Sequence, residues 1–383
     1  MPIIGEVYPA PLCEKERQYP AAHEVQPMKI RSGLTVLLSV TLLAACGVQN
    51  ATDSTVLAAQ GGNGKPTSGP RQVPARVFLP NPVQTTGDES LSDAKDSAGA
   101  VPASAYFPVT LTNLDGSGAL SGDYARVVSE TGAPVSVGGA LNFSRDQDGF
   151  EQVMAYFWVT EAQKYLQSLG FGSDLPAVNS DQQQIKVSQW GQDNSYQNDQ
   201  PDIIRLGKGG VDDAEDGEVI VHEYGHAVHA AQVPGFGSSL EAGSIGEAFG
   251  DYLALSVGEA VARANGAPIR TPLPCIADWD STSYTSTVPH CLRRTDTGKH
   301  SPEDVRGEVH ADGEIWSRAL WDIRRALGAR TADRIIIDAQ FRFAPDTGFA
   351  AAAQGTVDTA LALSGKGAAA SVRQAFVDRG ILR

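Results

Sequence analysis

Two histidines and a glutamate in one short stretch have the types and spacing of a metal centre. Residues 219–228 read VIVHEYGHAV, a pattern that predicts a helix ending before Pro234. Residues four apart share one face of a helix, so His222 and His226 could offer two imidazole nitrogens to one cation. Zinc suits such ligands. Glu223 follows the first histidine and could act as a general base on a water at the metal.

A catalytic zinc needs a third protein ligand and an open fourth position, and the next predicted helix offers a candidate. Residues 240–255 place Glu247 and Asp251 four apart among apolar or small residues, where buried carboxylates need partners. We therefore expect Glu247 to be the third ligand and Asp251 to hold His222 or His226 in its ligating tautomer. Without a metal, the first helix would be an ordinary buried helix with two hydrogen-bonded histidines. Glu247 and Asp251 would then be solvated acids on the face of the second helix.

Two further histidines have to be assigned a role. His229 lies one more turn along the first helix, and three ligands from one straight helix do not converge tetrahedrally, so we expect a structural or solvated side chain. His310 stands before a helix predicted over residues 314–323, where it is either a neighbour of the cap or a donor to a developing oxyanion. A metzincin would need a histidine in place of Gln232, which excludes that class.

The acidic stretch before the first helix has two interpretations. Residues 211–218 read VDDAEDGE, and carboxylates there would cap the helix and complement its positive end. Several oxygens within eight residues would also suit calcium, which stays open as a second metal.

The whole chain has 383 residues, 42% hydrophobic and 20% charged, which allows two domains and a sizeable core. The formal net charge of −15 argues against a nucleic-acid partner and against docking on anionic lipid by charge.

The N-terminal region predicts export. Residues 28–45 have a short basic start and an apolar run too brief to span a bilayer, and the run ends at LAAC, which resembles the lipobox of bacterial lipoproteins. We expect Cys46 to carry the lipid and to be the sole membrane contact; a plain secretory signal is the alternative. Because a signal peptide begins near the N-terminus, Met28 should be the true start, which makes residues 1–27 a mis-assigned extension.

The rest of the sequence outlines a fold of the α+β class. Residues 46–75 are polar and rich in Gly, Ser and Pro, which predicts a flexible tether. Short apolar groups with turn signals then predict a β-rich lobe over residues 76–233, which ends in the helix of the two histidines, and a helical lobe over residues 234–383. In an exported chain, Cys275 and Cys291 should form a disulfide. A Cys-His zinc site that adds His290 is the alternative, but it lacks a fourth ligand.

Three motifs in order carry a resemblance to a known family. HEYGH (222–226), GEAFGD (246–251) and VHADGEIW (309–316) together resemble the fungalysin-type metallopeptidases, gluzincins similar in architecture to thermolysin. The likeness runs from about residue 77 to the C-terminus. It implies a two-lobed enzyme with one zinc ion held by His222, His226 and Glu247, with Glu223 as the base and His310 as a transition-state donor.

The resemblance also implies that Asn194, Ser195 and Tyr196 form the edge strand along which peptide substrate lies. Two departures stand out: no tyrosine lies between His226 and Glu247, and no carboxylate clearly matches the one that orients the late histidine, although Asp304 and Asp312 are near. The stretch before residue 76 is also shorter than the usual propeptide of the family.

These features predict a monomeric zinc endopeptidase that acts on peptides or proteins, either lipid-anchored to the bacterial cell envelope or secreted. A gluzincin aminopeptidase would need an acidic exopeptidase motif such as Gly-x-Met-Glu-Asn, which is absent. A non-enzymatic surface protein that keeps zinc for structure would have no need of Glu223.

Overall fold

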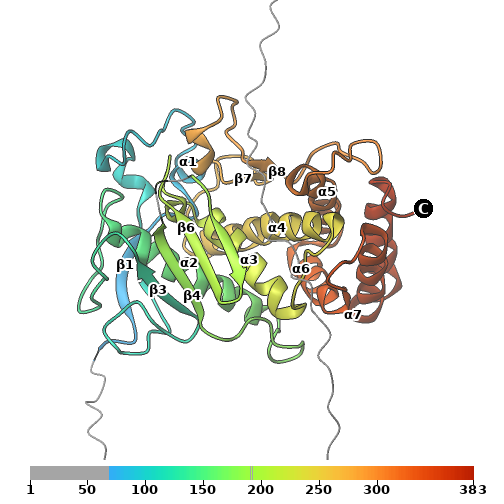
Figure 1. The fold of residues 1–383 in the computed structure, drawn as a ribbon, viewed down its shortest axis with the longest axis horizontal. Helices are drawn as coiled ribbons and strands as arrows, with labels where there is room; N and C mark the ends of the chain where they lie inside the picture. Colours follow the sequence, from blue (N-terminus) through green and yellow to red (C-terminus); the bar gives the residue numbers. More distant parts are fainter. Residues whose placement is uncertain (1–68, 190, 192) are drawn as a thin grey trace, which may run out of the picture. The chain divides into compact units, whose positions relative to one another are not determined.

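The computed structural model describes residues 69–189, 191 and 193–383. The predicted signal peptide, Cys46 and most of the predicted tether lie outside these residues. In the described part the fold is α+β, with the sheets mainly in the first half and helices in the second (Figure 1).

The strands are β1 (Val73–Val77), β2 (Phe107–Leu111), β3 (Ala125–Ser129), β4 (Gln183–Gln189), β5 (Tyr196–Asp199), β6 (Asp202–Gly207), β7 (Cys275–Ile276) and β8 (Arg293–Arg294). The α-helices are α1 (Pro82–Thr86), α2 (Asp148–Ser168), α3 (Gly217–Gln232), α4 (Leu240–Ala264), α5 (Val309–Leu327), α6 (Ala329–Ala339) and α7 (Phe349–Asp378). Short 3₁₀ turns are η1 (Ala98–Ala100), η2 (Ala103–Ala105), η3 (Asp213–Glu215), η4 (Asp280–Ser283) and η5 (Gln340–Arg342).

The largest sheet has the strand order β3-β4-β6-β5. β4 runs parallel to β3 and β6, and Ile185 at its centre pairs with Val127 on one side and Ile204 on the other. β5 is antiparallel to β6 and forms one edge, with Tyr196 opposite Arg205. β5 is therefore the outer strand of this sheet, which is the position at which a peptide can add as a further strand.

The long helix α2 packs on β3 and β4 and is buried almost all round. Trp158, fully buried, donates its indole N–H to the carbonyl of Phe78 at 3.3 Å. A Cβ on Gly217 would lie 2.3 Å from the Trp158 ring, so only glycine lets the start of α3 approach α2 this closely. α2 thereby fixes where the helix with the two histidines begins.

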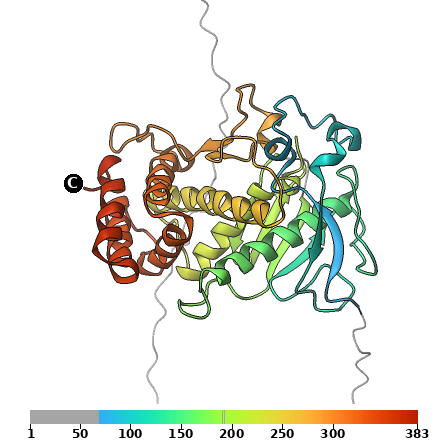
Figure 2. The same cartoon turned by 180° about the vertical axis from the view of Figure 1, so that it is seen from behind.

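Helix α4 packs along both α3 and α5, and both views show it running from the β-rich part toward the C-terminal helices (Figures 1 and 2). The crossing with α3 depends on a pair of glycines, because a Cβ on Gly225 would lie 2.9 Å from the Cα of Gly250. On the other side, a Cβ on Gly313 of α5 would lie 3.0 Å from the Ser244 carbonyl. These close approaches bring side chains from three helices to one place.

Some predicted boundaries differ from the structure. β1 begins at Val73, so residues 73–75 belong to a strand and not to the tether, because Val73 and Ala75 point into the core while Val73 pairs with Leu111. The apolar residues Val135 and Val137 are buried without forming a strand. Among the described helices, none is both long and apolar enough to cross a membrane.

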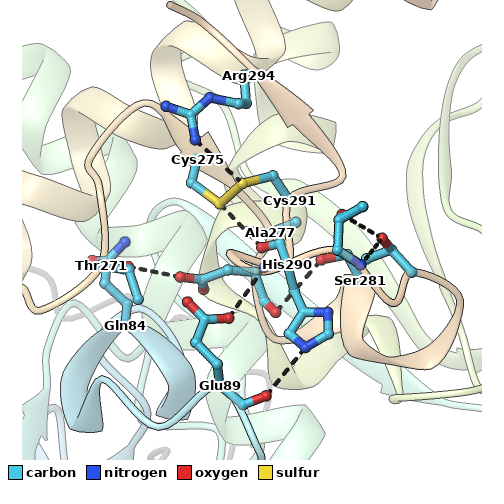
Figure 3. The surroundings of a disulfide bond; sticks show 12 residues. Gln84, Glu89, Thr271, Cys275, Ala277, Ser281, His290, Cys291 and Arg294 are labelled. Carbon is cyan, nitrogen blue, oxygen red and sulfur yellow. Dashed lines mark hydrogen bonds between the residues drawn. A yellow bond between two sulfur atoms is a disulfide. The ribbon is translucent and has the colours of Figure 1, made fainter.

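The two C-terminal cysteines form a disulfide, as predicted. Cys275 and Cys291 are joined with an S–S distance of 2.07 Å and a Cα–Cα distance of 5.1 Å. Figure 3 shows His290 beside this bond, and its ring Nε2 lies 3.1 Å from the backbone oxygen of Glu89. The sulfurs are therefore not zinc ligands, and the disulfide staples the loop between β7 and β8.

Candidate active site

The crossing of α3 and α4 brings two imidazoles and a carboxylate to one point. Ligand atoms of His222, His226 and Glu247 all lie within 4.8 Å of one another. The two Nε2 atoms are 3.2 Å apart, and they lie 3.3 Å and 3.8 Å from the Glu247 carboxylate oxygens. Two nitrogens and one oxygen that converge from two helices form a suitable donor set for a tetrahedral metal with one position left open.

The tautomer of His222 fits ligation. Its Nδ1 lies 2.9 Å from an oxygen of Asp251, so a proton belongs on Nδ1, and Nε2, 3.3 Å from Glu247, is the nitrogen that would ligate a metal. Arg293 donates two hydrogen bonds of 2.7 Å to the same Asp251 carboxylate and fixes it against the imidazole. Arg293 is not among the residues predicted from the sequence; it is the first residue of β8, two residues after Cys291 of the disulfide, and pairs with Ile276 of β7.

The buried charges make this point attractive to a cation. Burial alone would lower the pKa of His222, but hydrogen bonds with Asp251 and Glu247 outweigh it and raise the pKa to about 10. Burial would raise the pKa of Asp251, yet the Arg293 guanidinium holds it at about 2. The pKa of Glu247 is likewise held well below its usual range, against the effect of burial, by His222 and its neighbours. Both carboxylates are therefore ionised beside the imidazoles.

A glycine makes room for the first imidazole. A Cβ on Gly250 would lie 2.6 Å from Nδ1 of His222. Because Gly250 lies between Glu247 and Asp251 in sequence, a larger residue there would displace the ring from both carboxylates. Packing against the His222 ring thus explains the second glycine of the GEAFGD motif.

Glu223 follows His222 on α3 and is 6% exposed. Its carboxylate is close enough to the loop before α3 to raise the pKa of Asp213, a residue whose pKa is raised first by burial. Consecutive residues on a helix are about 100° apart, so Glu223 lies beside the donor set without being part of it.

His310 reaches the same point from the start of α5. Its Nε2 lies 3.3 Å from a Glu247 oxygen, and its Nδ1 lies 2.6 Å from Oε1 of Glu308. Glu308 is the N-cap of α5 and also accepts the backbone N–H groups of His310 and Ala311. Glu308 therefore orients the ring of His310, a role for which the sequence pointed to no residue; its position at the helix cap, two residues before the histidine, was the available signal.

The two carboxylates considered for that role have other partners. Asp304 accepts the backbone N–H of His300, and Asp312 accepts those of Arg306 and Gly307. Both fix the loop before α5, and among the hydrogen bonds of the described residues neither carboxylate bonds to the ring of His310.

Other candidate ligands lie elsewhere. His229 is buried and stacks on Phe236 with ring centroids 3.6 Å apart, and burial lowers its pKa well below its usual value, so it is a neutral core residue. Glu241 accepts the backbone N–H of Phe349 at the start of α7. In the acidic stretch, Asp216 is the N-cap of α3 and accepts the N–H of Glu218 at 2.9 Å, as capping predicts.

The predicted substrate edge lies against this region. Asn194 and Ser195 precede β5, and Tyr196 is its first residue. The Ser195 hydroxyl donates to Asp213 and accepts the N–H of Gly207 at 3.3 Å, while β5 packs against α3. The outer strand of the largest sheet thus lies next to the helix that carries Glu223.

Comparisons with known proteins point to one family. The model of the fungalysin metallopeptidase family (M36) matches residues 112–380. Among solved structures, the chain is similar to the precursor of protealysin, a metalloproteinase from Serratia proteamaculans, with a TM-score of 0.51 and 18% identity over 68% of this chain and 88% of that one. At that identity the likeness shows the fold, which is the two-lobed thermolysin-like architecture. No curated protein matches.

Proposed function

Because the chain belongs to the fungalysin metallopeptidase family, we propose that it is a zinc endopeptidase with its active site where α3, α4 and α5 meet. The observation that carries the proposal is the convergence of His222, His226 and Glu247 within 4.8 Å. Two imidazoles and one carboxylate form the ligand set of a catalytic zinc site, and Asp251 supplies the carboxylate that such histidines usually have behind them.

The proposed mechanism assigns a separate task to each side chain. A zinc ion held by the three ligands would polarise the scissile carbonyl and lower the pKa of a water there. Glu223 accepts the proton of the attacking water and later delivers a proton to the leaving amine. His310 donates from Nε2 to the developing oxyanion, and Glu308, next to Nδ1, orients the ring. The β5 edge holds the substrate backbone as an added strand.

The proposal is tested by measuring zinc in the purified full chain alongside cleavage of an unfolded protein. We expect about one zinc per chain, loss of cleavage on chelation and recovery on adding zinc back. A peptide blocked at its N-terminus should be cleaved internally. If only peptides with a free terminal amine were cleaved, one residue at a time, the aminopeptidase alternative would replace this proposal.

His310 should matter for rate and not for metal binding. Replacing it with phenylalanine removes one oxyanion donor, so we expect kcat to fall about 10²–10³-fold while the zinc content stays at the wild-type level. The matched control is His300→Phe, in the loop ten residues earlier, which should leave kcat unchanged. A wild-type kcat in the His310→Phe variant would remove His310 from the mechanism.

We also propose that the chain is exported and held at the cell envelope by a lipid on Cys46, a residue outside the described ones. The disulfide between Cys275 and Cys291 supports an oxidising compartment. Cys46→Ser should move the protein from the membrane fraction to the soluble fraction, as followed by immunoblotting. Unchanged partitioning would leave a plain secretory signal or another anchor as the explanation.

A further inference from the structure

A second acidic group, the Asp193–Asp213–Asp280 cluster, lies apart from the zinc ligands. One carboxylate oxygen from each residue lies within 4.8 Å of the others. The three come from separate segments: Asp193 precedes β5, Asp213 is in η3 and Asp280 is in η4. The fold therefore gathers three negative charges from positions far apart in sequence.

Two members of the cluster have buried oxygens without hydrogen bonds. Asp213 and Asp280 are 2% and 5% exposed. Oδ2 of Asp213 is bonded to Ser195, and Oδ2 of Asp280 accepts the Tyr284 hydroxyl at 2.7 Å. The Oδ1 atom of each accepts no hydrogen bond from the described residues. A buried carboxylate oxygen left in this way costs free energy unless a ligand satisfies it.

The cluster also lacks a compensating cation, in contrast to a similar group nearby. Asp96, Asp212 and Glu215 gather in the same way, but Arg145 lies 2.9 Å from Glu215 and Lys208 lies 3.2 Å from Asp212. Within the described part of the chain, no lysine or arginine forms an ion pair with any of the three residues of the cluster. The Asp96–Asp212–Glu215 group is thus neutralised in part by its own basic partners, whereas the Asp193–Asp213–Asp280 cluster has none among the described residues.

The charges in the cluster repel one another. Burial and the charge of Asp193 raise the pKa of Asp213 to about 8. Burial, followed by the charges of Asp213 and Asp193, raises the pKa of Asp280 well above its usual value. A divalent cation among the carboxylates would reverse the sign of this interaction.

We propose that Asp193, Asp213 and Asp280 bind one calcium ion. An ion at the centre of three oxygens that lie within 4.8 Å of one another would be at most about 2.8 Å from each, close to the 2.3–2.6 Å typical of calcium. All three donors are carboxylates, which suit a hard cation, and the exposed side of Asp193 leaves room for water ligands. Of the three ligands, only Asp213 comes from the acidic stretch before α3, and Asp216 of that stretch is instead the N-cap of α3.

A basic substrate side chain is the rival occupant, and crowding argues against it. A Cβ on Gly210 would lie 2.5 Å from Oδ2 of Asp193 and 2.7 Å from the hydroxyl of Ser283. Lysine or arginine would have to bring its methylene stem as well as its charge into this space, whereas calcium needs only the space between the oxygens.

The ion would connect the predicted substrate edge to the loops around it. Asp193 directly precedes residues 194–196, and Asp213 is bonded to the hydroxyl of Ser195. Asp280 is in a turn that also reaches the loop before η3, because the Ser283 hydroxyl accepts the N–H of Val211 at 2.6 Å. Calcium would therefore hold β5, η3 and η4 together.

The test uses the full chain, loaded with zinc and freed of calcium by a chelating resin. Terbium should bind in place of calcium and luminesce when Tyr284 or Trp279 is excited, since Tyr284 contacts Asp280 directly. Calcium should quench this signal in competition and raise the Tm by at least about 2 °C. Asp193→Asn, at an exposed position that does not endanger folding, should lose at least about tenfold in calcium affinity, with its zinc content unchanged.

Two further variants complete the test. Asp280→Asn should abolish the calcium-dependent rise in Tm and should be at least as stable as the wild type without calcium, because it removes repulsion. Asp96→Asn, in the compensated group, should keep the wild-type response to calcium. The proposal is overturned if calcium leaves the Tm unchanged or if Asp193→Asn and Asp280→Asn bind terbium like the wild type. It is also overturned if the two variants lose only the cleavage of peptides with lysine or arginine, which would assign the cluster to substrate.

Discussion

Glu223→Gln should remove nearly all peptide-bond hydrolysis while leaving zinc in place. Glutamine keeps the shape of glutamate but cannot accept a proton from the attacking water. General bases of this kind contribute about 10²–10⁴-fold to rate, and we expect kcat to fall by an amount at the upper end of that range. The ligands of the metal are His222, His226 and Glu247 in the proposed site, so the change leaves all three intact.

The measurement compares kcat on an unfolded protein with the zinc content and Tm of the same preparation. Glu303→Gln, an exposed glutamate in the loop before α5, is the matched control and should behave as the wild type. A Glu223→Gln variant with less zinc or a lower Tm would show that Glu223 has a structural role. Substantial kcat at full zinc content would mean that another group is the base.

The side chains that converge where α3 crosses α4 could be paired from the sequence because helix periodicity fixes their relation. His222 and His226 share a face by spacing alone, and so do Glu247 and Asp251. Placing one pair against the other needed only the expectation that buried carboxylates find partners. The same periodicity predicted α2 and the helical C-terminal half, although α4 extends to Ala264, well beyond the expected residue 255.

The residues that could not be predicted lie in segments without periodicity. Arg293 reaches Asp251 from the two-residue strand β8, whose position depends on the disulfide and on its pairing with β7. Asp280 joins Asp193 and Asp213 only because η4 packs near the sheet edge. Such contacts depend on tertiary packing, and the sequence contains no local signal for them. Glu308 is an intermediate case, since its place as a helix cap could have been inferred.

Two glycines in the family motifs have a structural role that the sequence alone does not reveal. Gly225 and Gly250 belong to the motifs that carry the family resemblance, yet the sequence gives them no chemical task. In the structure they let α3 and α4 touch, and Gly250 also leaves space for the His222 ring. The geometry of the proposed metal site therefore depends on two residues that would contribute no ligand.

Glu247→Ala should lose the metal, in contrast to Glu223→Gln. The carboxylate of Glu247 faces the Nε2 atoms of both His222 and His226, at 3.3 Å and 3.8 Å, so its removal leaves two imidazoles with no third donor. Replacing a group behind a ligand costs about 10–100-fold in metal affinity, and we expect the loss of a ligand to exceed that range. Activity should fall with the zinc content and return only in part at high zinc concentration.

Asp251→Asn provides the graded comparison, because it changes the partner of His222 and not a ligand. Its zinc affinity should fall within the 10–100-fold range and thus lie between the wild type and Glu247→Ala. Competition with a zinc chelator of known affinity measures all three proteins on one scale. If Glu247→Ala bound zinc as tightly as the wild type and stayed active, the third ligand would lie elsewhere. His229 and Glu241 could not easily replace it, because one is stacked in the core on Phe236 and the other caps α7.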